Sequence, residues 1–455
     1  MKKIRIGGGQ GFWGDSNDAA IHMIHEGNLD YMACDYLAEL TLSIMQRQKL
    51  KKPEAGYARD FVNLWKAVGK EAFEKHIRII TNAGGMNILG LVQVIKGLAE
   101  EQGLKGYKIG YVLGDDMMDK LPGLLEQGME FPNMDDTGDF EHVKTSIVNV
   151  NVYYGRKPLM ELLEQGVDLI ITGRCTDSAM FLAPLAYEFG WKDEDLDDLA
   201  KGIMVGHLLE CGGQGAGGNY MYGWRDVPDM DQLGFPIAEV TEDDLIITKA
   251  PNCGGLVCKE SVAEQFLYEI HDPANYITPD VTADISEATL EDVGPNMVRV
   301  AGIKGHPAPE KLKMCIGYHE GYKVETYLPF AWPDAYEKAK KAAEIIMKKM
   351  ERKGMQYDDL RIDYLGLNAL HLGVAEIDDD LIARTNEVVL RIAARSKEKK
   401  DVSMLIPEIA PLQLNGPPGA SFFGGRAHAQ DVVGLWPTLI DRDLVELTSH
   451  VVEVE

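Results

Sequence analysis

Apolar and polar residues repeat one order along the first half of the chain. A short run rich in β-branched residues leads into a glycine or polar turn, and apolar residues at helical spacing follow. The strand-and-turn segments fall at residues 4–11, 29–35, 77–87, 108–116 and 167–178, and the helical patterns at 37–45, 88–103 and 179–190. Such alternation predicts βαβ units and a parallel sheet. We therefore expect residues 1–240 to form one α/β domain, Rossmann-like, with a doubly wound and mostly parallel sheet.

The pattern changes from about residue 239. Strand-like runs follow one another up to residue 330, and a charged helical stretch then covers 334–354, ending at a glycine suited to a helix C-cap. A strand at 360–367 and a second helix around 379–396 are expected next. Residues 241–455 are thus predicted to form a second domain, of the α+β class. Its Gly/Pro-rich segment 406–437 carries aromatic residues, which favours an ordered loop over a linker.

Composition narrows the classes of function. Apolar residues make up 45% and charged residues 26% of the 455-residue chain, as in ordinary globular proteins. The net charge of −26 disfavours binding to nucleic acid and to anionic membranes. The amino-terminal sequence does not read as a secretory signal, and no run reaches the roughly 18 apolar residues that span a bilayer, so a cytoplasmic protein is expected.

The six cysteines are scattered, without a CxxC pair, and the histidines lack HExxH spacing. A disulfide framework and a zinc ribbon are therefore not expected, and we predict no metal site. The sequence does not identify a cofactor.

The candidate binding residues lie where the predicted strands end. Ligands of open parallel sheets bind beyond the carboxyl ends of the strands, so these ends are the expected site. The first loop, GGGQGFWGD, lacks the lysine and the spacing of a P-loop. Gly9, Gly11 and Gly14 do match GxGxxG, with Asp35 as the acid about twenty residues later, but a packing turn is the favoured alternative. Acids that follow the loop also disfavour a pyrophosphate. We expect Gly8, Gly9 and Gly11 to allow close backbone approach, with Asp15 facing a ligand or the helix start.

Two further loops carry polar groups suited to an anion. In TNAGGMN, Asn82, Gly84, Gly85 and Asn87 offer backbone N–H groups and carboxamides for a carboxylate or phosphate, and an Asn N-cap is an equal alternative. In GRCTDS, Arg174 can grip a carboxylate. Its neighbour Asp177 can orient that arginine, act as a base, or cap the following helix.

Three other segments add candidates. GHLLECGGQG brings together His207, Glu210, Cys211 and Gln214; Glu210 is a candidate general acid or base, and Cys211 is better explained as part of a helix end than as a nucleophile. Lys249 is a possible anion partner, with a simple exposed lysine as the more frequent case. In the GPPGASFFGGRAH segment, Arg426 and His428 are candidates for a lid.

The ordered series of motifs GGGQGFWGDS, TNAGGMN, ITGRCTDSA, GHLLECGGQGAGG, TKAPNCGGLV and NGPPGASFFGGR resembles the large domain of the acyclic terpene utilisation family of bacterial catabolic proteins. The resemblance implies a role in the breakdown of branched acyclic terpenoids and related acids, beside acyl-CoA enzymes. Longer members carry a small second domain. Because this chain stops at Glu455, we expect a separate small partner subunit, and also a homo-oligomer.

These observations favour a lyase or hydratase that acts on a branched carboxylic acid or acyl-CoA. In that interpretation Glu210, Asp177 and Arg174 are catalytic. The residues Gly8, Gly9, Gly11, Asp15, Asn82, Gly84, Gly85, Asn87, Gln214, Lys249 and Arg426 bind substrate. The alternatives are a nucleotide-dependent enzyme that holds NAD or CoA at the first glycine loop, and a non-catalytic scaffold for a small subunit. The absence of a GxSxG elbow disfavours a hydrolase.

Overall fold

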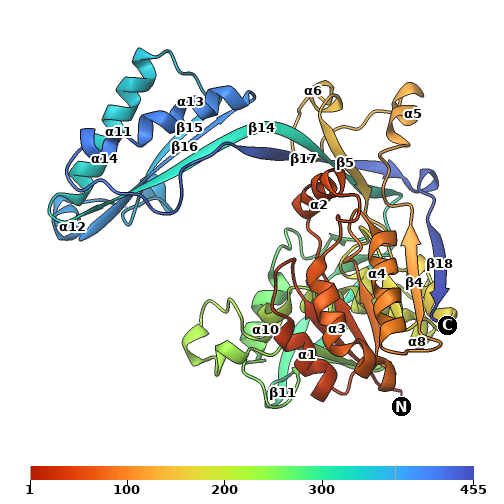
Figure 1. Cartoon of the computed structure of the whole chain (residues 1–455). Coiled ribbons are helices and arrows are strands. Elements are labelled where there is room, and N and C mark those ends of the chain that lie inside the picture. The colour runs from red at the N-terminus through yellow and green to blue at the C-terminus, as the bar shows by residue number, and fades with distance from the viewer. Residues whose placement is uncertain (1, 375) are drawn as a thin grey trace. The chain divides into compact units, whose positions relative to one another are not determined.

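The computed structural model describes residues 2–374 and 376–455 and divides the chain into two compact units (Figure 1). The first unit comprises Met1–Gly317 together with Leu435–Glu455, and the second comprises Tyr318–Gly434. The second unit is therefore inserted in the sequence of the first. Residue 240, after which the sequence predicts a domain boundary, is the last residue of strand β7 (Pro236–Val240) and lies inside the main sheet of the first unit.

The first unit is built on a ten-stranded mixed sheet in the order β11-β12-β8-β7-β1-β2-β3-β6-β4-β18. Its parallel centre consists of β1 (Ile4–Gln10), β2 (Tyr31–Cys34), β3 (Arg78–Thr81), β6 (Leu169–Ile171) and β4 (Lys108–Leu113). Antiparallel strands extend it on both sides: β7 (Pro236–Val240), β8 (Leu245–Lys249), β12 (Met297–Ala301) and β11 (Thr289–Gly294) on one, and β18 (Thr448–Glu453) on the other. The α/β class is confirmed, but a mostly parallel sheet is wrong, because strands after residue 235 join this sheet instead of starting a new domain.

The central strands are buried on both faces, since neighbouring residues of one strand belong to different apolar clusters. Ala33 and Ile80 pack in one cluster with residues of α8 (Ala179–Phe189) and α9 (Leu196–Leu209). Met32 and Ile79 pack in the other, with residues of the helices α1 (Asn17–Glu26), α3 (Arg59–Glu74) and α4 (Ile88–Glu101). The continuous apolar runs of the strands thus match helices on both sides of the sheet.

The first unit contains further helices and strands. The helices are α2 (Glu39–Lys51), α5 (Leu121–Glu126), α6 (Glu141–Lys144), α7 (Lys157–Glu164) and α10 (Lys259–Leu267), with 3-10 helices η1 (Gly212–Ala216), η2 (Trp224–Asp226), η3 (Met230–Gln232) and η5 (Arg442–Leu444). The strands are β5 (Ile147–Val152), which pairs with β14, and β9 (Tyr276–Ile277), β10 (Thr282–Asp284) and β13 (Lys304–His306), which form a separate small sheet.

The second unit holds a sheet in the order β15-β16-β14-β17, in which β16 pairs antiparallel with both β15 and β14. Its strands are β14 (Lys311–Ala331), β15 (Asp359–Leu365), β16 (Glu387–Ser396) and β17 (Gln430–Asp441). Its helices are α11 (Ala335–Arg352), α12 (Asp379–Arg384), α13 (Lys399–Ile409) and α14 (Leu412–Asn415), with the 3-10 helix η4 (Leu372–Val374). β14 and β17 contribute residues to both units.

The sequence expectations for the second unit are partly confirmed. The helix at 334–354 and the strand at 360–367 are present. The helix expected around 379–396 is wrong beyond α12, because 387–396 is the strand β16. Val388, Leu390, Ile392 and Ala394 are buried at every second position, as a half-buried strand requires.

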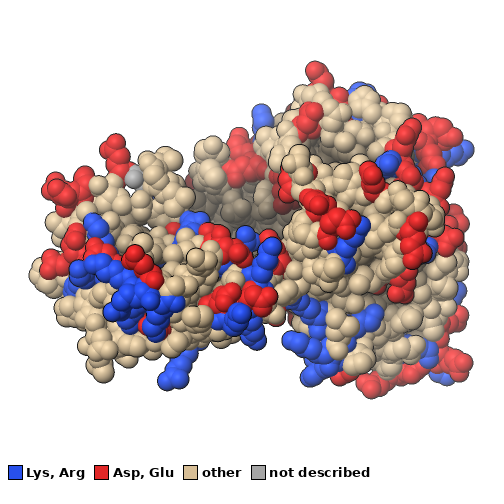
Figure 2. Space-filling view, turned by 90° about the horizontal axis from the view of Figure 1, so that it is seen from above, with Lys and Arg blue, Asp and Glu red and all other residues tan. Residues whose placement is uncertain are grey.

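Acidic side chains are spread over much of the face seen in Figure 2, in keeping with the net charge of −26. In the described part of the chain, no helix combines the length and apolar character needed to cross a membrane.

Candidate active site around Arg174

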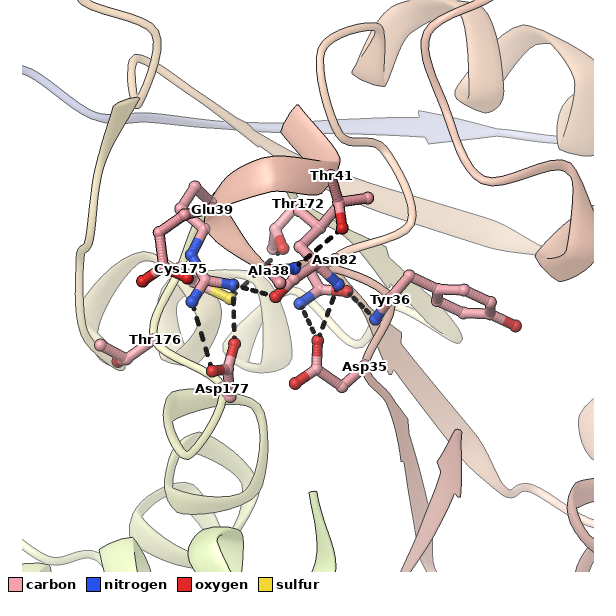
Figure 3. A network of polar contacts seen from close by, with 12 residues as sticks. Asp35, Tyr36, Ala38, Glu39, Thr41, Asn82, Thr172, Cys175, Thr176 and Asp177 are labelled. Carbon is pink, nitrogen blue, oxygen red and sulfur yellow. Dashed lines mark hydrogen bonds and ion pairs between the residues drawn. The ribbon is translucent and has the colours of Figure 1, made fainter. Parts of the chain in front are cut away.

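Arg174 lies in the loop between β6 and α8 and is almost fully buried, with 3% of its surface exposed. Its guanidinium donates to both carboxylate oxygens of Asp177, at 2.8 and 3.3 Å, and to the carbonyl of Leu37 at 2.6 Å. Figure 3 shows the Asp177 carboxylate, with dashed lines that mark its contacts. The backbone N–H of Arg174 donates to the Asp115 carboxylate at 2.7 Å. The loop therefore ties the ends of β2, β4 and β6 together.

Aromatic and charged groups surround the same guanidinium. The Arg174 guanidinium lies over the ring of Tyr153, 4.2 Å from the ring centre. The Lys313 ammonium lies 4.8 Å from the centre of the same ring. Lys313 also pairs with Glu39 at 3.0 Å. Burial alone would raise the pKa of Glu39, but Arg174 and Lys313 outweigh burial and lower it to about 2. Glu39 is thus an ionised partner of the two cations.

Asp35 lies directly after β2 and is 6% exposed. Its Oδ1 accepts from the Asn82 side chain at 2.6 Å and from the backbone N–H of Leu37 at 3.0 Å. Burial raises its pKa to about 6, against the opposing effects of Arg174 and Asn82. Burial likewise raises the pKa of Asp115 to about 6. These carboxyl groups change charge near neutral pH, which suits acid–base catalysis.

Asp177 and Glu210 complete the acidic group. Burial raises the pKa of Asp177 well above its ordinary value, and the charges of Asp35 and Glu210 add to this while Arg174 opposes it. Glu210, at the end of α9, is 9% exposed and lies 3.4 Å from Nδ1 of His207. His207 is 1% exposed, and neither ring nitrogen has a hydrogen-bond partner among the described residues. Its ring packs on Tyr276 at 5.3 Å.

The helix-cap alternative for Asp177 is not what the structure has. The N-cap of α8 is Ser178, and the Asp177 carboxylate faces Arg174. The structure therefore brings the predicted residues Arg174, Asp177 and Glu210 into one group with Asp35. These residues all belong to the first unit.

The polar groups of the TNAGGMN loop form hydrogen bonds within the protein. Asn82 is fully buried, and its amide is used by Asp35 and by the backbone N–H of Tyr36. Asn87 is the N-cap of α4, where it accepts from Gly90 N–H and donates to the carbonyls of Pro53 and Ala55. A β-carbon at Gly84 would lie 2.5 Å from the Thr172 carbonyl oxygen, and one at Gly85 would lie 2.3 Å from Met45.

The first glycine loop is packed against the chain itself. A β-carbon at Gly8 would lie 2.2 Å from the Leu209 carbonyl oxygen, one at Gly9 2.7 Å from the Cys34 sulfur, and one at Gly11 2.7 Å from the Cys211 backbone. The space beside these glycines is thus filled by protein, which favours the packing turn over a nucleotide cradle. Leu209 and Cys211 flank Glu210, so the loop fixes the position of that acid.

The other candidates lie outside the Arg174 group. The Asp15 carboxylate accepts from the N–H groups of Gly11 and Ser16, so it closes its own loop, and it lines a cavity of about 420 Å³. Gln214 accepts from Asn219, and Lys249 donates to the Cys253 carbonyl at 2.7 Å. Arg426 belongs to the second unit.

Thiol and metal chemistry gain no support from this geometry. Burial and the Glu210 charge raise the pKa of Cys211, and burial raises the pKa of Cys175 to about 12, so neither thiol is activated. Among the described residues, no group of three or more His, Cys, Asp or Glu side chains is arranged to hold a metal ion.

Sequence reasoning missed Glu39, Tyr153 and Lys313. Glu39 reads as an ordinary polar position of a helix, although its place four residues after Asp35 is a usable signal. Tyr153 and Lys313 carry no local signal, because they meet through a backbone hydrogen bond between distant segments, from Tyr153 N–H to the Lys313 carbonyl.

Comparison with known proteins identifies the family. A search of curated proteins and a search of solved structures gave no match. A family model described as "Acyclic terpene utilisation family protein AtuA" matches residues 4–451. Because that range covers nearly all of the 455 residues, the chain belongs to the acyclic terpene utilisation family of catabolic proteins.

Proposed function

We propose that the Arg174 group catalyses proton transfer in a lyase or hydratase reaction on a branched acyl substrate. The observation that carries the proposal is the gathering of Asp35 and Asp177 at the buried Arg174 guanidinium, with Glu210 close enough to act on the pKa of both acids. Burial raises the pKa values of Asp35 and Asp177, and such acids are typical of general acid–base sites.

The balance of charge favours an uncharged reacting group. Arg174 and Lys313 are already matched by Asp177 and Glu39, and Asp35 and Glu210 add further negative charge. A free carboxylate placed here would be repelled. We therefore propose an acyl thioester, of the acyl-CoA class, as the substrate form rather than the free acid.

Each proton transfer of this reaction is assigned to a carboxyl group of the site. In the dehydration direction, one carboxylate takes the proton from the carbon next to the thioester carbonyl. A protonated carboxyl group gives a proton to the leaving hydroxyl, which departs as water and leaves an enoyl thioester. Asp35 and Glu210 are the proposed proton carriers, and Arg174 positions Asp177. Hydration runs through the same steps in reverse.

An assay of the purified chain with branched 3-hydroxyacyl and enoyl thioesters tests this proposal. We expect Glu210→Gln and Asp35→Asn each to lower kcat by about 10²-fold to 10⁴-fold, the usual contribution of a general acid or base. Asp197→Asn is the matched control, since Asp197 pairs at the surface with Lys304. Wild-type rates in both variants would overturn the assignment. Absence of thioester turnover in the purified chain, alone and with any co-purifying subunit, would overturn the reaction class.

The small partner subunit and the homo-oligomer stay predictions. Co-purification from the native host would test the first, and light scattering of the purified protein would test the second.

A further inference from the structure

The second unit contains a cavity of about 580 Å³ between helix α13, the loop after α14 and strand β14. Its wall is mainly apolar and includes Ile406, Pro407, Ile409 and Phe422. This volume lies within the range of about 300–1,000 Å³ that is usual for small-molecule sites. The cavity has the size and the lining of a binding site for an aliphatic chain.

The charge of this cavity comes from Arg426. No other lining residue is ionisable at neutral pH. Across residues 2–374 and 376–455, Arg426 makes neither an ion pair nor a hydrogen bond. In contrast, Arg361, Arg391 and Arg395 of the same unit each pair with an acid. Arg426 therefore brings an unpaired positive charge to the wall of an apolar cavity, in a chain with a net charge of −26.

The glycines before Arg426 leave room for a ligand. A β-carbon at Gly424 or at Gly425 would meet no atom within 4 Å. Both glycines line the cavity, and their backbone N–H groups donate to none of the described residues. They are therefore free to donate to an anionic head group held at Arg426.

We propose that this cavity binds an aliphatic carboxylate, with its chain along the apolar wall and its carboxylate at Arg426. The apolar wall accounts for the chain, and the single positive charge accounts for a head group with one negative charge. This site lies in the second unit and is separate from the Arg174 group in its residues and its chemistry. The proposal of a carboxylate site does not depend on the thioester reaction proposed for the Arg174 group.

Calorimetric titration of the full chain with decanoate tests the proposal, with decanol as the neutral probe and decyltrimethylammonium as the cationic one. We expect saturable binding of decanoate and markedly weaker binding of the other two. Arg426→Gln should weaken decanoate binding by about tenfold or more, because a hydrogen-bonded charge is lost.

Gly425→Leu is expected to weaken binding, because Gly425 lines the cavity and the substitution adds a bulky side chain to its wall. Gly373→Leu is the matched control: it places the same side chain at an exposed glycine of the same unit, also with no atom within 4 Å, outside the cavity lining.

Methyl NMR of protein labelled at isoleucine locates the ligand. Decanoate should shift the signals of Ile406 and Ile409, which line the cavity, and leave Ile170 and Ile171 of the β6 strand unchanged. Shifts at Ile170 and Ile171 alone, or binding unaffected by both Arg426→Gln and Gly425→Leu, would overturn the proposal. Loss of thioester turnover in the first unit would not affect this readout.

Discussion

The two units each place an arginine directly after a glycine, and they treat its charge in opposite ways. Arg174, after Gly173, is 3% exposed and donates to Asp177 and to the Leu37 carbonyl. Arg426, after Gly425, is exposed and has no partner in the described part of the chain. A buried cation must be matched by acceptors, whereas an exposed one is satisfied by water. Arg174 is therefore committed to the protein, and Arg426 is available to a ligand.

Replacing Arg174 should have the largest effect on stability. Arg174→Met removes the cation from a group of buried acids and should cost about 3–5 kcal/mol of unfolding free energy, the usual result of breaking a buried pair. Urea unfolding at neutral pH measures this loss. A cost below about 1 kcal/mol would show that the acids are hydrated or protonated and would remove the contrast with Arg426.

One glycine from each unit extends the comparison to the backbone. Gly8→Ala places a methyl group 2.2 Å from the Leu209 carbonyl oxygen and should cost about 3 kcal/mol through overpacking. Gly425→Ala meets no atom within 4 Å, so its effect should stay within about 0.5 kcal/mol. Thermal unfolding of both variants compares them, and equal losses would contradict this account of the first loop.

The acids around Arg174 predict a dependence of stability on pH. The pKa of Asp35 is about 6 in the folded chain, above its ordinary value of 3.8, so the folded state holds the proton more tightly. Unfolding free energy therefore falls as pH rises through the window between these values, and the cost is complete at pH 7. Asp35→Asn removes the ionisable group and therefore this loss of unfolding free energy. Relative to wild type, it should gain on the order of 2 kcal/mol at pH 7 and little near pH 4.

Glu39 supplies the control of opposite sign. Its pKa is lowered to about 2, so its ion pairs stabilise the fold above its ordinary pKa and lose this effect as pH falls toward 2. Glu39→Gln should therefore destabilise the protein at pH 7 and have a shrinking effect in acid. Parallel urea series across pH would show both trends, and a gain from Glu39→Gln at pH 7 would refute the charge balance.

Replacing Arg426 should have the smallest effect on stability. Arg426→Met breaks no ion pair in the described chain, so unfolding free energy should change by less than about 0.5 kcal/mol while decanoate affinity falls. Unfolding and titration of the same sample separate the two effects. A stability loss comparable with that of Arg174→Met would mean that Arg426 is structural.

Local patterns predicted the parallel centre of the first sheet, because each of its strands is an apolar run followed by a turn. They did not predict that β7, β8, β11 and β12 join the same sheet, since antiparallel pairing depends on neighbours distant in sequence. The sequence of strand β16 predicts a helix because arginines interrupt its apolar residues, and only pairing with β14 and β15 fixes the two-residue period.

Local sequence patterns likewise predict only part of the candidate site. Arg174, Asp177 and Glu210 follow from their places at the ends of predicted elements, and the structure brings them together. Asn82, Asn87, Gly8 and Lys249 have the same local signature, but their polar groups or open sides are used by the fold. Sequence pattern reveals a donor or an acceptor, and tertiary packing decides whether a ligand can reach it.

The insertion of the second unit has a consequence for how the protein is made and altered. During synthesis, the whole of residues 318–434 must emerge before β18 can cover the open edge of β4, so the first unit waits, incomplete, on the ribosome. The two ends of the insertion nevertheless meet, since a β-carbon at Gly434 would lie 2.3 Å from the Tyr318 ring. A tight hairpin turn joining Gly317 to Leu435 would therefore excise the second unit and yield a smaller protein that consists of the first unit alone.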